Sequence, residues 1–215
     1  LAPGERPELL QRLDEPTSGI VCAALTPQAA RDFRAAEAAG ICEKRYLALL
    51  TGELAAPVTA RAKLDTRDRR VTRLLAAEAG PLRRTEILPL HIWRGEEAAR
   101  LLARLGVTGA LPAGTETPAA LTLAACRIRR GSRHQIRAHA AGLGHALLGD
   151  GRYAPAGAPP AFGERFFLHH GLLAWPGYFC AAPAPWPWLG ELLPATAWGE
   201  VRAWFSPEAS RESVA

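Results

Sequence analysis

Apolar and polar positions change along the chain in patterns that predict its strands. Residues 20–25 form a short apolar run that fits a buried strand, and residues 43–51 predict a second strand. Residues 84–93 and 121–129 predict two more, and a further apolar run covers residues 166–175. Together these segments supply enough strands for a sheet.

Helix signals lie between these runs. Thr26 and Pro27 provide an N-cap and a proline at the first helical position, and they open an alanine-rich helix that Gly40 closes. Residues 96–105 predict an amphipathic helix, and a basic helix is expected to start at Ser132. Strands and helices are mixed without regular alternation, so the pattern favours an α+β fold over a doubly wound sheet.

The segments between these elements are charged or rich in glycine and proline. Residues 61–73 are strongly charged, which indicates a loop or an exposed hairpin, and residues 109–118 and 154–163 indicate surface loops. We expect a single domain over residues 1–205 and a frayed tail over residues 206–215.

Positive charge is concentrated in one part of the chain. The net charge is +5 at pH 7, and of the 26 lysines and arginines only Lys44 and Lys63 are lysines. Arginine binds phosphate with a planar fork of donors and stacks on bases, although a GC-rich genome also raises the arginine content. Residues 121–152 hold six arginines and one acid, and such a basic segment indicates a nucleic-acid partner.

Several classes of protein are excluded by what the sequence lacks. No stretch reaches the roughly 18 to 20 consecutive apolar residues of a membrane helix, and no signal peptide opens the chain. The four cysteines form no CxxC pair, and neither a P-loop nor an HExxH zinc motif occurs. We therefore expect a soluble cytoplasmic protein with no membrane contact and no metal site.

Three segments carry candidate chemistry. Residues 12–19 have the sequence RLDEPTSG, which indicates a tight turn that presents Asp14. Residues 43–47 have the sequence EKRYL, and residues 131–139 have the sequence GSRHQIRAH, with GHALLGDGRY following at residues 144–153. Taken singly, these segments fit a surface salt bridge, a core tyrosine and an ordinary basic helix.

In order, composition and separation, the three segments resemble the RluA-type pseudouridine synthases. The segment RFFLH at residues 165–169, with Pro176, is similar to a further element of that family, and the resemblance covers residues 11–180. It implies the pseudouridine synthase fold, a mixed and mainly antiparallel sheet with flanking helices and a central RNA-binding cleft. It also implies that the chain isomerises uridines in rRNA or tRNA to pseudouridine.

The chain departs from the family pattern at several places. Residues 131–133 transpose the usual Gly-Arg-Ser/Thr, which moves a phosphate-binding arginine by one residue. His170 stands where the family has alanine, and residues 95–118 resemble a local insertion. Only 13 residues precede Asp14, where the family carries a strand-rich segment, and the chain contains no methionine. Either an N-terminal segment is missing from this sequence or the sheet is completed in a different way.

The reaction that the resemblance implies requires particular side chains. Breaking the bond between ribose and uracil leaves positive character on the sugar, so a carboxylate must lie beside it. The resemblance assigns this role to Asp14, with Arg137 as the basic partner that favours its ionised form. Tyr46 matches the tyrosine that stacks on the base and accepts a proton from its carbon, and Leu168 belongs to the pocket wall. Arg12 matches the arginine that fills the gap left by the flipped base.

The remaining expectations concern geometry and partners. Asp14, Tyr46 and Arg137 must meet in one cleft, with a charge-assisted contact between Asp14 and Arg137 at about 2.7 to 3.2 Å. No redox or hydrolytic step is involved, so no cofactor is implied. We expect a monomer that binds RNA through the following residues: Arg12, Arg129, Arg130, Arg133, His134 and Gln135.

Two other functions stay open from the sequence. A catalytically inactive RNA-binding relative would share the fold; the short N-terminal part favours it, and the presence of Asp14, Tyr46 and Arg137 argues against it. A hydrolase that cleaves a nucleoside or glycosidic bond needs a second acid beside Asp14, and neither Glu15 nor Asp150 has an evident reason to serve.

Overall fold

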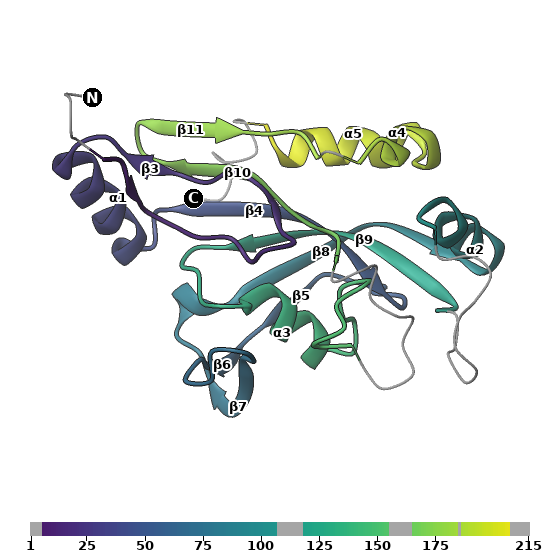
Figure 1. The fold of residues 1–215 in the computed structure, drawn as a ribbon. Helices are drawn as coiled ribbons and strands as arrows, with labels where there is room; N and C mark the ends of the chain where they lie inside the picture. Colours follow the sequence, from purple (N-terminus) through teal and green to yellow (C-terminus); the bar gives the residue numbers. More distant parts are fainter. Residues whose placement is uncertain (1–5, 107–117, 155–164, 185, 207–215) are drawn as a thin grey trace.

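The computed structural model describes residues 6–106, 118–154, 165–184 and 186–206. Its central sheet contains seven strands (Figure 1). Six of them follow one another in the order β11 (Tyr178–Ala181), β10 (Leu168–Trp175), β4 (Glu43–Thr51), β9 (Ala120–Ile128), β8 (Thr85–Arg94) and β5 (Val58–Ala60). The seventh, β2 (Ser18–Gly19), runs parallel to β10, and all other pairs are antiparallel.

Two small sheets and several helices accompany the central sheet. The small sheets pair β1 (Glu8–Leu9) with β3 (Ala23–Ala24), and β6 (Ala62–Asp65) with β7 (Arg73–Glu78). The helices are α1 (Pro27–Ala39), η1 (Pro81–Arg83), α2 (Gly95–Arg104), α3 (Gln135–Gly142), α4 (Trp188–Leu192) and α5 (Ala195–Trp204). The architecture is therefore α+β with a mainly antiparallel sheet, as the sequence predicted.

Strand β4 is buried on both faces, because other elements cover the sheet on each side. Leu47 and Leu49 belong to the core formed with α2, α4 and α5, whereas Tyr46, Ala48 and Leu50 belong to the core formed with α3. Successive side chains of a strand point to opposite faces. This alternation places Tyr46 on the side of the sheet where α3 packs.

Helix α1 begins and ends where the sequence predicted. The Thr26 hydroxyl accepts the N–H of Ala29 at 3.1 Å, and Pro27 is the first helical residue. Gly40 closes the helix in a left-handed conformation with φ of 73°. These signals are local in the sequence, and they were sufficient to predict both ends of α1.

The apolar run over residues 20–25 does not form the buried strand that the sequence predicted. Only its middle is paired, as β3, and Ile20 and Cys22 are buried while Val21 and Leu25 are more than half exposed. The partner of β3 is the exposed strand β1, so one face of the run meets solvent. The alternation of buried and exposed side chains in this run follows from its place at the surface of the protein.

Other differences concern helix α3 and the C-terminal part. Helix α3 begins at Gln135 rather than at Ser132, because His134 has a left-handed backbone with φ of 52°. Strand β11 and helices α4 and α5 were not predicted. The charged residues 61–73 belong to the hairpin of β6 and β7, one of the two predicted alternatives. The predicted loops at 109–118 and 154–163 and the predicted tail lie, apart from their ends, outside the described residues.

None of the helices in the described ranges is long and apolar enough to cross a bilayer.

Candidate active site

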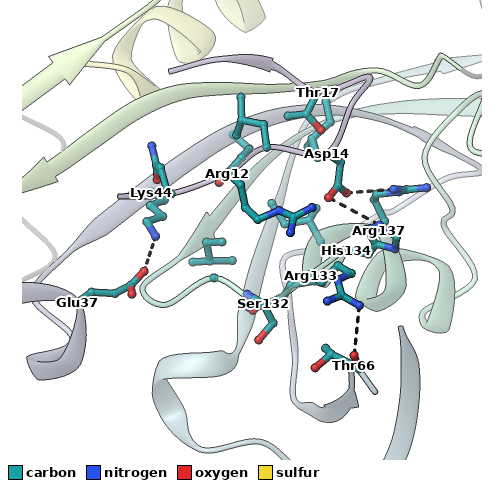
Figure 2. A pocket seen from close by; sticks show the side chains of 18 of the residues that line it. Arg12, Asp14, Thr17, Glu37, Lys44, Thr66, Ser132, Arg133, His134 and Arg137 are labelled. Carbon is teal, nitrogen blue, oxygen red and sulfur yellow. Dashed lines mark hydrogen bonds and ion pairs between the residues drawn. The ribbon is translucent and has the colours of Figure 1, made fainter. Parts of the chain in front are cut away.

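A pocket of about 380 Å³ opens on the α3 side of the sheet (Figure 2). It lies between the segment that precedes β2, the strands β4 and β10, and the start of helix α3. Asp14, Tyr46 and Arg137 all line it, although they are far apart in the sequence. Leu168 also belongs to its wall. The prediction that these side chains meet in one cleft is therefore confirmed.

A tight turn presents Asp14 to this pocket. The N–H of Thr17 donates to the carbonyl oxygen of Asp14 at 2.8 Å, and Gly19 then pairs with β10. Gly19 has φ of 114°, and a Cβ at this position would lie 2.1 Å from the carbonyl oxygen of His170. Only glycine tolerates both this backbone conformation and this close approach. The glycine after the turn thus lets the segment that carries Asp14 lie against the sheet.

Arg137 joins Asp14 to a second carboxylate. Its Nη1 donates to Oδ2 of Asp14 at 3.0 Å, within the predicted range. Its Nε and Nη2 donate to the two oxygens of Asp150 at 2.6 and 2.8 Å. The Asp150 side chain is 1% exposed, whereas that of Asp14 is 20% exposed. Asp150 therefore anchors the guanidinium, and Asp14 is the carboxylate that faces the pocket.

Two aromatic rings restrict Arg137 further. Its guanidinium carbon lies 4.3 Å from the ring centre of Phe166 and 5.1 Å from that of Tyr153. No role was predicted for Asp150 or Tyr153 from the sequence, although both lie in the candidate segment GHALLGDGRY. That segment was the available signal, and only the fold shows that it surrounds Arg137.

Tyr46 is buried beside Asp14, and its ring stacks on that of His170 with centres 4.5 Å apart and an interplanar angle of 18°. Burial raises the pKa of Tyr46, and the negative charge of Asp14 raises it further. The phenol is therefore protonated in the free protein. His170, which departs from the family pattern, packs against one face of the Tyr46 ring.

His170 also makes the stability of the protein depend on pH. Its Nδ1–H donates to the carbonyl oxygen of Ile20 at 2.7 Å, and its Nε2 has no partner among the residues that the structure describes. Burial lowers the pKa of His170 to about 4, from an ordinary value of 6.5. Protonation of His170 would place a charge in the core, where burial makes it unfavourable.

We expect the free energy of unfolding to fall as the pH drops from about 6.5 to about 4, because the unfolded chain binds the His170 proton more readily than the folded protein does. This group contributes a slope of at most about 1.4 kcal/mol per pH unit. The change His170→Asn keeps a donor for Ile20 and cannot titrate, so it should flatten the curve. Urea unfolding at several pH values measures this, and identical slopes in both proteins would contradict it.

Lys44 is a pocket residue that the sequence analysis did not identify. Its side chain is 4% exposed, and its ammonium lies 2.5 Å from Oε1 of Glu37 at one end of the pocket (Figure 2). Lys44 precedes Tyr46 by two positions on β4, so the strand period places both on one face. That spacing was the signal from which Lys44 could have been found.

The residues expected to bind RNA fall into two groups. In the first group, Arg12 and Arg130 form no side-chain hydrogen bond or ion pair with any described residue, so their charges are available to a ligand. Figure 2 shows Arg12 extending across the pocket, between Lys44 and Asp14. His134 lies deeper, with Nε2 3.7 Å from Oδ1 of Asp14.

In the second group, the side chains are engaged inside the protein. Arg129 donates to the carbonyl oxygen of Gly40 at 3.0 Å, at the end of helix α1. Arg133 lines the pocket, and its Nη1 donates to the carbonyl oxygens of Thr66 and Asp68 at 3.3 and 3.1 Å. Arg133 therefore ties the loop of the β6–β7 hairpin to the pocket.

Gln135 also belongs to this second group. It is 2% exposed, and its Nε2 donates to the carbonyl oxygens of Arg83 and Arg84, each at 3.1 Å. Its Oε1 accepts the N–H of Ser132 at 3.0 Å. Because its amide is already engaged, we revise its role from RNA binding to fixing the loop before α3. The sequence alone does not distinguish such a buried amide from one that faces a ligand.

In the described part of the chain, no group of three or more His, Cys, Asp or Glu side chains is arranged to hold a metal ion.

Comparison with solved structures shows the same fold elsewhere. The human RNA pseudouridylate synthase domain containing 1 superposes with a TM-score of 0.65 at 22% identity, over 94% of this chain and 81% of that one. The human RNA pseudouridylate synthase domain containing 4 has a TM-score of 0.60 at 15% identity, over 91% and 76%. At these identities the likeness concerns the fold.

Comparison of sequences is more specific. The ribosomal large subunit pseudouridine synthase D of Zymomonas mobilis is 27% identical over 177 residues, which cover 78% of this chain. The chain spans only 43% of the length of that relative. A family model described as RNA pseudouridylate synthase matches residues 3–142, from before Asp14 to the end of α3. Because this match covers well over half of the chain and the RluA-type motifs within it, the chain belongs to the RNA pseudouridylate synthase family.

Proposed function

We propose that this chain isomerises uridine in RNA to pseudouridine, with Asp14 as the catalytic carboxylate. The observation that supports this most is the position of Asp14, a partly exposed carboxylate on the pocket wall whose Oδ2 accepts a hydrogen bond from Arg137 at 3.0 Å. A fixed carboxylate of this kind suits attack on a sugar carbon or stabilisation of positive charge there.

In the proposed reaction, the bond between C1′ of the ribose and N1 of uracil breaks while Asp14 stabilises C1′ or bonds to it. The freed base turns and forms a bond between its C5 and C1′, which releases Asp14. The proton on C5 leaves and N1 gains a proton, so atoms and electrons balance without any external reagent. The target nucleotide must first leave the base stack.

Tyr46 and Arg12, which both line the pocket, have separate roles in the proposed reaction. The Tyr46 ring offers a flat apolar surface for the uracil, backed by His170 at 4.5 Å. Burial and the charge of Asp14 raise the pKa of Tyr46, so its phenol is protonated in the free protein. Tyr46 accepts the C5 proton only as a phenolate, so its own proton must leave first, and N1 of the freed uracil, which gains a proton in the reaction, is the balanced destination for it. Arg12 is exposed and able to enter the space left by the base.

The hydrolase alternative lacks a second acid in the right place. The other acid that lines the pocket with Asp14 is Glu37, and it is paired with Lys44 at 2.5 Å. Asp150 is buried and bound by Arg137 through both of its oxygens. Neither carboxylate is placed to activate a water opposite Asp14. An assay for pseudouridine formation tests the alternative of an inactive RNA-binding relative.

The assay should start with ribosomal RNA. The relative from Zymomonas mobilis is named as a synthase of the ribosomal large subunit, so a large-subunit rRNA transcript is the first substrate to test, and a tRNA transcript is the second. Pseudouridine is detected by chemical labelling and by release of tritium from C5 of uridine. RNA binding without pseudouridine on either RNA would favour the inactive relative. A cytoplasmic location and a monomeric state remain predictions.

RNA affinity is expected to fall steeply with salt, because arginine–phosphate contacts release counterions. The change Arg130→Gln should reduce the slope of log K against log salt by about one, because the guanidinium of Arg130 has no hydrogen-bond or ion-pair partner among the described residues. The exposed Arg100 of α2 pairs with Glu96, so Arg100→Gln is the matched control. A titration that is flat between low and moderate salt would exclude a phosphate-lined groove.

A further inference from the structure

His134 has an unusual backbone at the start of helix α3. With φ of 52°, it is the one non-glycine residue in the described ranges that adopts a positive φ. A bulky side chain keeps such a conformation only where its surroundings fix it, and such positions gather at functional sites. The His134 side chain is 8% exposed and lines the pocket beside Asp14. The contacts of its two ring nitrogens show how the side chain is held in place.

The first ring nitrogen is held by Tyr153. Nδ1 of His134 lies 2.8 Å from the Tyr153 hydroxyl oxygen, which also accepts the N–H of Thr72 at 2.7 Å. A phenol has one hydrogen to donate, and Thr72 already occupies a lone pair of its oxygen. The hydroxyl hydrogen can be directed to Nδ1 when Nδ1 is unprotonated. Nε2 faces Oδ1 of Asp14, and a carboxylate oxygen only accepts, so this geometry favours neutral His134 with its single proton on Nε2.

The second ring nitrogen points at Asp14. Nε2 lies 3.7 Å from Oδ1 of Asp14, while Oδ2 of the same carboxylate accepts from Arg137 at 3.0 Å. A separation of 3.7 Å is too long for a hydrogen bond, but catalytic contacts in free enzymes often shorten once the substrate is bound. The two carboxylate oxygens thus face two different donors, one cationic and one neutral.

The charges around His134 favour its neutral form. Burial lowers the pKa of His134, and Asp14 opposes this shift, whereas Arg137 and Arg152 add to it and Asp150 opposes it. Tyr153 faces the ring as an uncharged donor. A neutral N–H orients a carboxylate without cancelling its charge, but an imidazolium would add a second cation beside Arg137. That cation would make Asp14 a weaker nucleophile.

We propose that His134 is a positioning residue for Asp14, and that the Tyr153 hydroxyl holds it in the neutral form with the proton on Nε2. This inference rests on the proposed role of Asp14 in pseudouridine formation. The contact of Thr72 with Tyr153 extends the arrangement to the β6–β7 hairpin, because Thr72 immediately precedes β7 and its hydroxyl donates to the carbonyl oxygen of Arg133 at 2.8 Å.

Two substitutions of His134 separate its chemistry from its structural role. In His134→Gln the amide nitrogen reaches the place of Nε2, and in His134→Asn it reaches only the place of Nδ1. Asparagine tolerates the left-handed backbone better than glutamine does, so a merely structural role predicts that the Asn variant is the better enzyme. We expect the reverse order, with kcat lowered about 100-fold in His134→Asn and about tenfold in His134→Gln, at unchanged KM for RNA.

The pH profile gives a second readout. When His134 takes up a second proton on Nδ1, Tyr153 loses its acceptor and a positive charge lies beside Asp14, so kcat of the wild type should fall at acidic pH, below the ordinary titration range of histidine. The fall of kcat at acidic pH that is due to His134 should be missing in His134→Gln, because glutamine does not titrate. The change Tyr153→Phe removes one hydroxyl and should lower kcat about tenfold. Equal rates and equal profiles in all four proteins would overturn the proposal.

The tautomer is measured without any turnover. Long-range nitrogen NMR correlation spectra of the free protein distinguish a proton on Nε2 from one on Nδ1. We expect Nε2–H in the wild type and a mixture in Tyr153→Phe. A proton on Nδ1 in the wild type would overturn the inference even in an active enzyme. Absence of pseudouridine formation by the wild type, with the expected tautomer present, would instead refute the proposed function and with it the role of His134 in that reaction.

Discussion

The change Asp14→Asn is expected to abolish pseudouridine formation, with a loss of about 10⁴-fold or more, while RNA affinity and stability stay close to those of the wild type. The amide has the shape of the carboxylate, and its oxygen still accepts a hydrogen bond from Arg137, which lies 3.0 Å from Oδ2. It has no negative charge to attack C1′ or to stabilise positive character on the sugar. The measurement is tritium release under single-turnover conditions.

The controls for this experiment test whether deamidation restores the carboxylate and whether the variants are folded. Asp14→Ala should be equally inactive, which excludes a carboxylate restored by deamidation of Asn. Glu96→Gln removes an exposed acid at the start of helix α2 and should retain full activity. Thermal unfolding and the RNA titration show that the inactive proteins are folded. Appreciable turnover by Asp14→Asn would remove Asp14 from the proposed role and favour a different carboxylate.

The change Arg137→Met is expected to reduce both stability and activity. It leaves Asp150, with a side chain that is 1% exposed, as a buried charge without its bidentate partner. Removing one partner of a buried pair costs about 3 to 5 kcal/mol. It also removes the donor to Asp14, and we expect kcat to fall by about 10²- to 10³-fold. Urea unfolding and single-turnover kinetics measure the two effects.

A double variant separates the two effects of Arg137. In Arg137→Met with Asp150→Asn, the buried charge is gone, and the amide oxygen can still accept the N–H of Arg152, which lies 3.2 Å from Oδ1 of Asp150. We expect this variant to recover more than half of the lost stability and none of the lost activity. Recovery of both would mean that Arg137 acts only by holding the fold. Recovery of neither would mean that the Asp150 charge is not the cause of the instability.

Helix and strand boundaries were predictable where their signals are local. The N-cap Thr26 and the C-terminal Gly40 define α1 from within the helix itself. The end of β4 at Thr51 follows from the glycine that comes directly after it. The start of α3 was wrong by three positions, because His134 has a left-handed backbone and its ring contacts Tyr153, which lies 19 residues further along the chain. Such a contact leaves no periodic pattern in the sequence.

The C-terminal helices were missed for a related reason. Helix α4 has five residues, too few for a clear helical period, and α5 follows Pro194 in a segment rich in proline and tryptophan. Trp188, Leu189 and Val201 are buried in the core formed with α2 and with Leu47 and Leu49 of β4. Tertiary packing, more than local propensity, stabilises these short helices.

By itself, the sequence determined the α+β class, most of the long elements and the family, because alternation, caps and ordered motifs are properties of neighbouring residues. Tertiary structure alone decided what each arginine does. Arg137 finds Asp150 across 13 residues and Asp14 across 123, whereas Arg129 turns to Gly40 and Arg12 faces the pocket. In the sequence these arginines look alike. The partner of a guanidinium depends on which distant carboxylates, carbonyls and rings the folded chain brings within about 3 to 5 Å of it.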